Sequence, residues 1–319
     1  MDAPRDDAEA PTPLRVGTHS GSFHADEVFA LATLRLARGP LEIVRSRDPQ
    51  VLATCTLRVD VGRRYDPAGG DFDHHQGDVG ERANGIRYAS FGLVWKEHGR
   101  EIAGSDEVAA AIDVQLVAPI DAGDNGQELY EPLVPGVTPH TVSGVIAAIN
   151  PPWDTEDGAR AEREAFDEAV DLAEGILRRE LAGAQGRARA AGLVRAALER
   201  AEDPRVLVLD RGMPWKKIVV AEAPEVLFVV APRTRDWSLQ AVPAGEHGFA
   251  NRKDLPAAWA GLEGEPLQQV TGVPDAVFCH GARFMAVAGS REGAMELVRQ
   301  ALADDAAAAV DPADVLSAD

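Results

Sequence analysis

Short runs of apolar residues alternate along the chain with longer segments in which apolar residues recur every three or four positions. The short runs predict β-strands, the longer segments predict amphipathic helices, and their alternation is typical of α/β architecture. The predicted strands cover residues 14–17, 41–44, 57–61, 205–209, 226–230, 237–242, 276–279 and 284–288. The predicted helices cover residues 26–38, 88–98, 106–120, 141–149 and 291–303.

A segment rich in Ala, Glu and Arg lies between the two groups of strands, at 159–200, with its apolar side chains at helical spacing. We expect a pair of helices here, interrupted near Gly183 or Gly192, because glycine weakens a helix interior. We therefore expect a first domain with a parallel sheet and a smaller, mixed α/β second domain, as suits 319 residues. The predicted divisions are a disordered tail at 1–13, a first domain at 14–155, a helical connector at 156–202, a second domain at 203–303 and an acidic tail at 304–319.

Composition and charge narrow the class of protein. With 45% hydrophobic and 26% charged residues the chain has an ordinary globular composition, but 52 acidic against 32 basic residues leave a net charge of -20. This charge disfavours diffuse binding to polyanions, although a local basic groove or divalent metal ions can still hold phosphate. The two cysteines, Cys55 and Cys279, imply neither a disulfide framework nor a thiolate zinc site. Without a secretory signal or an apolar stretch of roughly 20 residues, we expect a cytoplasmic protein that does not bind membranes.

Histidine is scarce, yet four of the eight fall between His19 and His75, each in a short segment that also contains carboxylates or another histidine. Taken singly, such residues are usually turn, cap or surface positions. Here, however, four acidic or histidine-containing segments each follow an apolar element, at 19–27, 58–62, 71–76 and 119–126. Because parallel strands end at one edge of a sheet, we expect these segments to meet there.

The segments supply imidazoles and carboxylates but no thiolate, a ligand set that suits Mn²⁺, Mg²⁺, Fe²⁺ or Zn²⁺. The number of candidate ligands exceeds the needs of one tetrahedral ion. We therefore expect two ions roughly 3.5–4 Å apart that share a carboxylate and generate a bridging hydroxide near neutral pH.

The run Asp73-His74-His75, after an apolar strand that ends at Asp60, resembles the DHH phosphoesterase superfamily. Residues 17–27, 59–62, 72–76 and 120–126 narrow the resemblance to the melanocyte proliferating gene one family of metal-dependent hydrolases. Later segments agree with this family, at 208–211, 214–216, 237–243, 251–256 and 291–294. The resemblance covers nearly the whole chain apart from its tails, and it implies a DHH-type first domain.

The resemblance also implies a set of ligands, with Mn²⁺ preferred and Mg²⁺ or another divalent ion as alternatives. One ion would be held by His19, His24 and Asp60, and the second would be held by Asp26, Asp60, His74 and Asp121. His75 would face the substrate phosphate, while Asp73 would orient a ligand histidine. For Asp124 two interpretations stay open, a metal ligand or a cap of the turn at Asn125-Gly126, and we favour the cap.

The activity that the resemblance implies is exonucleolytic hydrolysis of RNA or short single strands from the 3′ end, by attack of the hydroxide on phosphorus. In DHH enzymes a smaller C-terminal domain closes over the metal site and grips the substrate. Aromatic and cationic residues of the second domain are therefore candidates for base stacking and phosphate pairing, and they are Trp215, Lys216, Lys217, Arg252, Lys253 and His280.

Two other functions remain open at this point. The same site could serve a phosphohydrolase for small anions such as pyrophosphate, a cyclic dinucleotide or a very short oligonucleotide, which the net charge of -20 slightly favours. The chain could also be a non-catalytic metal-binding scaffold, although the ligand inventory has no obvious lost position. Association with further copies of the chain is likewise left open.

Overall fold

The chain folds into two compact units. A computed structural model describes residues 13–77, 79–245 and 248–304. The first unit ends at Gln185 and the second begins at Gly186, so the boundary lies within the segment expected as a connector, at 156–202. Apart from residues 13 and 304, the predicted tails at 1–13 and 304–319 lie outside the described residues. Within the described ranges, no helix combines the length and apolar character needed to cross a membrane.

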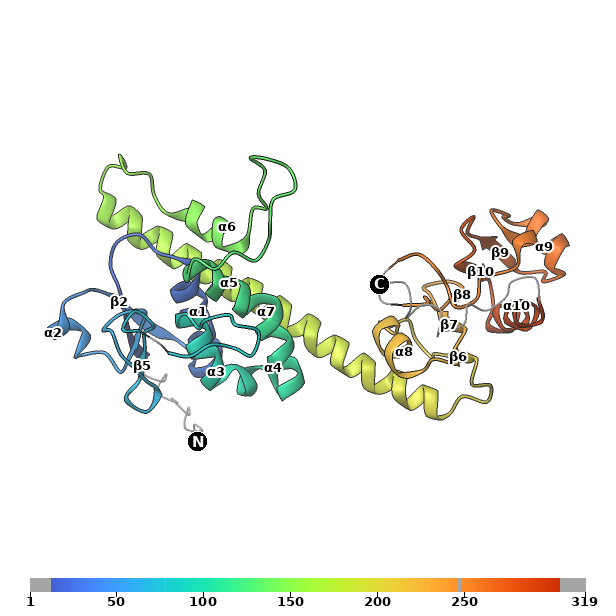
Figure 1. The fold of residues 1–319 in the computed structure, drawn as a ribbon, viewed down its shortest axis with the longest axis horizontal. Coiled ribbons are helices and arrows are strands. Elements are labelled where there is room, and N and C mark those ends of the chain that lie inside the picture. Colours follow the sequence, from blue (N-terminus) through green and yellow to red (C-terminus); the bar gives the residue numbers. More distant parts are fainter. Residues whose placement is uncertain (1–12, 78, 246–247, 305–319) are drawn as a thin grey trace, which may run out of the picture. The chain divides into compact units, whose positions relative to one another are not determined.

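A five-stranded sheet in the order β2-β1-β3-β5-β4 forms the centre of the first unit (Figure 1). β4 runs antiparallel to its neighbour β5, whereas the other pairings are parallel. Because β1, β3 and β5 are parallel, the segments that follow them begin at one edge of the sheet. The strands are β1 (Leu14–Thr18), β2 (Leu41–Arg45), β3 (Leu57–Val59), β4 (Tyr65–Asp66) and β5 (Asp71–Phe72).

Helices α1 and α3 pack against this sheet, and α1 packs closely against α3. The fully buried rings of Phe29 and Phe91 lie 5.3 Å apart at this contact. The segment expected as one helix at 106–120 is a nearly continuous helical run with a π-helical stretch (Asp113–Val117) between α4 and α5. The helices are α1 (Ala25–Arg38), α2 (Pro49–Leu52), a 3-10 turn (Pro67–Gly69), α3 (Ser90–Ala103), α4 (Asp106–Ile112), α5 (Ala118–Asp124), α6 (Val142–Ile149) and α7 (Gly158–Glu199).

The second unit has a mixed sheet in the order β6-β7-β8-β10-β9, with β6 parallel to β7 and the other pairs antiparallel. Alternate residues of β7 belong to two separate apolar clusters, Phe228 with Leu297 and Val229 with Val219. Both faces of the sheet are therefore covered. The elements are β6 (Val206–Val208), α8 (Lys216–Glu222), β7 (Phe228–Pro232), β8 (Trp237–Ala241), a 3-10 turn (Ala257–Trp259), α9 (Glu265–Thr271), β9 (Ala276–Cys279), β10 (Met285–Ala288) and α10 (Arg291–Ala303).

The expected interruption in 159–200 is wrong, because α7 is one helix of 42 residues. Apolar side chains at helical spacing remain buried on both sides of the glycines, among them Leu177, Leu181 and Val194. A glycine costs a helix about 1 kcal/mol relative to alanine, whereas burying one leucine or valine side chain contributes about 1.5–3 kcal/mol. Packing therefore outweighs the local preference of glycine.

Gly192 tests this continuity, since it lies exposed in α7 and an added Cβ would have no atom within 4 Å. We expect Gly192→Ala to raise the free energy of unfolding by about 1 kcal/mol and Gly192→Pro to lower it by about 3 kcal/mol. Denaturant unfolding followed by far-ultraviolet circular dichroism measures both. A helix interrupted at this position would gain nothing from alanine and would tolerate proline.

Candidate metal centre

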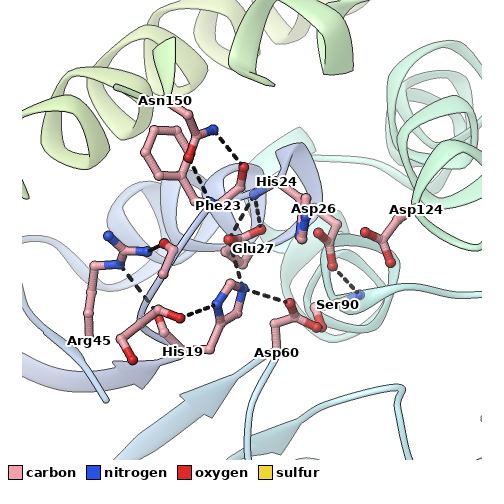
Figure 2. A network of polar contacts seen from close by, with 12 residues as sticks. His19, Phe23, His24, Asp26, Glu27, Arg45, Asp60, Ser90, Asp124 and Asn150 are labelled. Carbon is pink, nitrogen blue, oxygen red and sulfur yellow. Dashed lines mark hydrogen bonds and ion pairs between the residues drawn. The ribbon is translucent and has the colours of Figure 1, made fainter. Parts of the chain in front are cut away.

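The ends of three parallel strands bring acidic and histidine side chains together in the first unit. His19 follows β1, Asp60 follows β3, and the run 73–75 follows β5. The first turn of α1 adds Asp26 and Glu27, as Figure 2 shows. Ligand atoms within 4.8 Å of one another form three overlapping groups, which are His19–His24–Glu27–Asp60, Asp60–His74–His75 and His24–Asp26–Asp124.

Asp60 belongs to two of these groups and joins them. Its Oδ2 is 3.4 Å from Nε2 of His19, and its Oδ1 is 3.4 Å from Nε2 of His74. The Ser90 hydroxyl, at the start of α3, donates a hydrogen bond of 2.9 Å to Oδ1. The backbone of Asp60, the residue after β3, has a φ of 56°, an unusual value for a residue other than glycine. One carboxylate thus serves both imidazoles through separate oxygens.

The histidine after β1 is held between a carbonyl and a carboxylate. Nδ1 of His19 lies 3.2 Å from the backbone oxygen of Ser20, and Nε2 lies 3.0 Å from Oε1 of Glu27. Glu27 is fully buried and also accepts a hydrogen bond from the backbone N–H of His24. Sequence reasoning gave Glu27 no role, although its position three residues after the helix N-cap is a capping-box spacing that could have revealed it.

The second imidazole meets a residue that the sequence interpretation had favoured as a turn cap. Nε2 of His74 lies 3.0 Å from Oδ2 of Asp124, at the end of α5, and 4.0 Å from Oδ2 of Asp26. The carboxylates of Asp26 and Asp124 face each other in Figure 2. Asp124 therefore belongs to the cluster.

Asp121, the expected ligand, is engaged elsewhere. It is fully buried; its Oδ2 pairs with Nη2 of Arg82 at 2.8 Å, and its Oδ1 accepts a 3.0 Å hydrogen bond from the backbone N–H of Gly92. Position 92 must be glycine, because a Cβ there would lie 1.9 Å from Oδ2 of Asp121. Burial raises the pKa of Asp121 to about 7 although Arg82 opposes the shift. The structure thus places Asp124, and not Asp121, beside His74.

Asp73 orients His75, the histidine expected to face the substrate. Oδ1 of Asp73 accepts a hydrogen bond of 2.9 Å from the backbone N–H of His75 and lies 2.8 Å from Nδ1 of its ring. Oδ2 accepts one of 2.6 Å from the backbone N–H of Arg63. The side chain of His75 is 55% exposed, so its Nε2 is accessible to a ligand.

The charges in this cluster fit a divalent cation. Oδ1 of Asp26 and Nε2 of His74 are buried and lack any partner with hydrogen-bond geometry. Burial and then the charges of Asp60 and Glu27 raise the pKa of Asp26 well above its ordinary value. A cation with oxygen and nitrogen ligands would relieve this repulsion and satisfy both atoms.

In the absence of such an ion, protons on the histidines balance the carboxylates. Burial favours a neutral His19, but hydrogen bonds with Asp60 and Glu27 outweigh it and raise the pKa of His19 to about 10. Burial is likewise outweighed at His74, where Asp124 and Asp60 raise the pKa to about 10. Burial by itself would raise the pKa of Asp60, but the two histidines lower this pKa below its ordinary value. Metal ligation would require neutral imidazoles, so the ion would replace these protons.

The loop between β1 and α1 is fixed from outside the cluster. Arg45 donates from Nε to the backbone oxygen of His19 at 3.2 Å and pairs through Nη1 with Glu162 of α7 at 2.7 Å. Asn150 forms two hydrogen bonds of 3.0 Å with the backbone N–H and C=O of Phe23 (Figure 2). These contacts hold the His19 backbone without using any cluster atom.

The candidates in the second unit divide into buried and exposed residues. The guanidinium of Arg252 donates to four backbone oxygens, of Val219, Val220, Ala223 and Val226. Nζ of Lys253 donates to the oxygen of Leu302 at 3.2 Å, and Trp215 lies within an apolar cluster. These contacts serve the fold and give no support to the expected substrate roles of these three residues. The exposed candidates are Lys216, Lys217 and His280.

The fold and the cluster define an α/β protein with a histidine–carboxylate centre suited to divalent metal ions. The chain matches the family model MYG1_exonuc, described as "Uncharacterised protein family (UPF0160)", over residues 15–302, and it belongs to this family. The family resemblance seen in the sequence is therefore confirmed, while the wider DHH relationship stays a prediction.

Relatives in animals and amoebae span nearly the same length. The MYG1 exonucleases of Mus musculus and Homo sapiens are each 33% identical to the chain, covering 94% and 91% of it and 87% and 86% of their own lengths. The MYG1 protein of Dictyostelium discoideum is 29% identical over 88% of the chain and 94% of its own length.

Among solved structures, a pGpG-specific phosphodiesterase, PggH of Vibrio cholerae, is 14% identical to the chain, with a TM-score of 0.32. The match covers 91% of this chain and 99% of that one. A likeness of this size does not establish a shared fold.

Removal of the central carboxylate tests the metal centre. We expect Asp60→Asn to weaken Mn²⁺ binding by more than about tenfold, because one carboxylate faces both imidazoles. Isothermal titration calorimetry measures the affinity and the number of ions bound. Asp106→Asn is the matched control, since that side chain is 78% exposed at the start of α4. Unchanged Mn²⁺ binding by Asp60→Asn would contradict the assignment.

Substitutions of the two aspartates of α5 should have different effects on Mn²⁺ binding in the same titration. Asp124→Asn should weaken Mn²⁺ binding, whereas Asp121→Asn should leave the affinity within about threefold and lower the free energy of unfolding by about 1–3 kcal/mol, because Arg82 loses a buried partner. Calorimetry and denaturant unfolding of both variants measure these effects. The reverse pattern would restore Asp121 as the ligand.

Proposed function

We propose that this chain is a divalent-metal-dependent phosphodiesterase that removes nucleotides from the 3′ end of RNA or of short single strands. The broader statement, a hydrolase of phosphodiester bonds, follows from membership in a family whose mammalian members are named exonucleases. The observation that carries the proposal is the placement of Asp60 between His19 and His74, because a carboxylate shared by two imidazoles suits paired ions.

Two half-sites that share Asp60 would hold the ions, for which we propose Mn²⁺. His19, His24 and Glu27 complete the first half-site, and the second is completed by Asp26, His74 and Asp124. When bound, divalent ions supply Lewis acidity, which lowers the pKa of water and offsets negative charge on phosphate.

His75 acts on the phosphate in this proposal. Asp73 holds the ring through Nδ1, and an imidazolium in this orientation would donate a hydrogen bond from Nε2 to a non-bridging oxygen as charge develops there. Water attacks the phosphorus, the bond to the 3′ oxygen of the preceding ribose breaks, and that oxygen leaves as a hydroxyl. The released product is a nucleoside 5′-monophosphate.

In this proposal the exposed basic residues of the second unit contact the substrate. Lys216 and Lys217 lie in the first turn of α8, and His280 follows β9. Nδ1 of His280 accepts a hydrogen bond from the backbone N–H of Ala282, which fixes the ring. Exposed lysines of this kind can pair with the phosphates of a single strand despite the net charge of -20.

Digestion of a short 5′-labelled RNA with Mn²⁺ tests the proposal. We expect a ladder shortened from the 3′ end, with the rate lowered at least about a thousandfold in Asp60→Ala and in His74→Ala, because metal ligands are lost. Arg100→Gln is the control, since Arg100 forms an exposed pair with Asp106 at the end of α3 away from Ser90.

Two outcomes would contradict the exonuclease proposal. Release of phosphate from pyrophosphate without any shortening of RNA would indicate a small-anion phosphohydrolase that uses the same cluster. No turnover of either substrate, with Mn²⁺ binding retained, would indicate a metal-binding scaffold.

A further inference from the structure

We propose that Arg87 forms a second phosphate-binding subsite, distinct from the metal cluster, that recognises the phosphate on the 5′ side of the bond being cleaved. The inference rests on the proposed function and deepens it by naming a residue that selects substrates with a second phosphate. It starts from a cavity of about 690 Å³ in the first unit, which reaches the cluster at His74 and His75. The other lining residues are Gly77, Val79, Gly80, Glu81, Arg87, Tyr88 and Asn125.

A short hairpin positions Arg87 at this cavity. Residues 81 and 87 pair across an antiparallel bridge, and the backbone N–H of Arg82 donates to the oxygen of Ile86 at 2.9 Å. The next residue, Tyr88, is fixed by Arg82, whose guanidinium carbon lies 4.4 Å from the centre of the ring. Arg82 itself pairs with the buried Asp121. The hairpin is thus anchored to the helical layer of the first unit.

The turn that ends α5 ties this hairpin to the cluster. Asp124 lies beside His74, whereas Asn125 donates through Nδ2 to the backbone oxygen of Arg87 at 3.4 Å. Gln127 accepts from the backbone N–H of Arg87 at 2.8 Å and donates to the oxygen of Gly85 at 3.0 Å. One turn of four residues therefore positions a carboxylate of the cluster and also holds the backbone N–H and C=O groups of Arg87.

The charge of Arg87 is available to a ligand. Its side chain is exposed, and no carboxylate of the described residues, including Glu81 across the bridge, lies within ion-pair distance of its guanidinium. The cluster carboxylates Asp60, Asp73 and Asp124 are among those that it does not reach. The cluster therefore leaves the guanidinium unneutralised, and its charge can pair with a phosphate other than the one that meets His75.

The volume of the cavity agrees with a ligand larger than one phosphate. Small-molecule sites occupy about 300–1,000 Å³, and about 690 Å³ lies within that range. A guanidinium binds phosphate oxygens through two parallel hydrogen bonds. In a chain of net charge -20, a single well-placed cation of this kind can select for a second phosphate without creating a basic surface.

Two dinucleotides that differ in one group test the inference. The 5′-phosphorylated diadenylate pApA and the unphosphorylated ApA contain the same scissile bond, and only the first offers a second phosphate. With Mn²⁺ we expect the wild-type protein to have a lower KM for pApA. Arg87→Gln should raise the KM for pApA roughly 10- to 100-fold, to the value for ApA, while kcat and KM for ApA change little. Arg87→Lys should recover part of the difference, and Arg100→Gln should behave as wild type.

The outcomes separate this inference from the proposed function. If wild type cleaves pApA and ApA but Arg87→Gln changes neither, or slows both equally, the second subsite is not at Arg87. If the wild-type protein cleaves neither of the two dinucleotides nor a longer RNA, the proposed function fails and the subsite fails with it. Circular dichroism melting of Arg87→Gln identifies a folding defect, and in that case the KM values of Arg87→Lys decide the matter.

Discussion

Three buried carboxylates, Asp26, Glu27 and Asp60, interact with one another in the first unit, and their mutual repulsion is the constraint around which the site is organised. Burial of uncompensated charge is costly, so each carboxylate must find a proton, a hydrogen-bond donor or a cation. His19 and His74 supply protons, and the start of α3 supplies donors from Ser90. The oxygen of Asp26 that remains without a donor is the clearest sign that a cation belongs there.

The surrounding fold keeps these charges from moving apart. Parallel β1, β3 and β5 end at one sheet edge, which places their following loops side by side. The N-terminal ends of α1 and α3, where helix dipoles favour negative charge, lie at the carboxylates. Arg45, Asn150 and Glu162 fix the loop after β1 from its outer side. Rigid supports of this kind preserve a ligand geometry that the charges alone would oppose.

Local patterns predicted much of this arrangement, and they failed where long-range contacts decide. The strands at 14–17 and 41–44 and the helix at 291–303 agree with β1, β2 and α10 because a buried face imposes its period on the sequence. The expected break in α7 is absent, because burial of Val194 and its neighbours outweighs glycine. Asp121 and Asp124 are indistinguishable by spacing alone. Arg82, nearly forty residues away, decides which of the two joins the cluster.

The sequence by itself determined the α/β class, the family and the segments that carry the cluster, since apolar periodicity and short motifs are local properties of the chain. Only the tertiary structure decided that Glu27 and Asp124 join His19 and His74, that Asp73 holds His75, and that Arg252 is used within the fold. These roles depend on which groups meet after folding, and a carboxylate or guanidinium looks the same in sequence whether its partner is a metal ion, a backbone oxygen or a substrate. The difference between what the sequence and the tertiary structure determine follows from the range of the interactions. The spacing of hydrophobic residues is a property of one helix or strand, whereas the partners that compensate a charge come from elements distant along the chain.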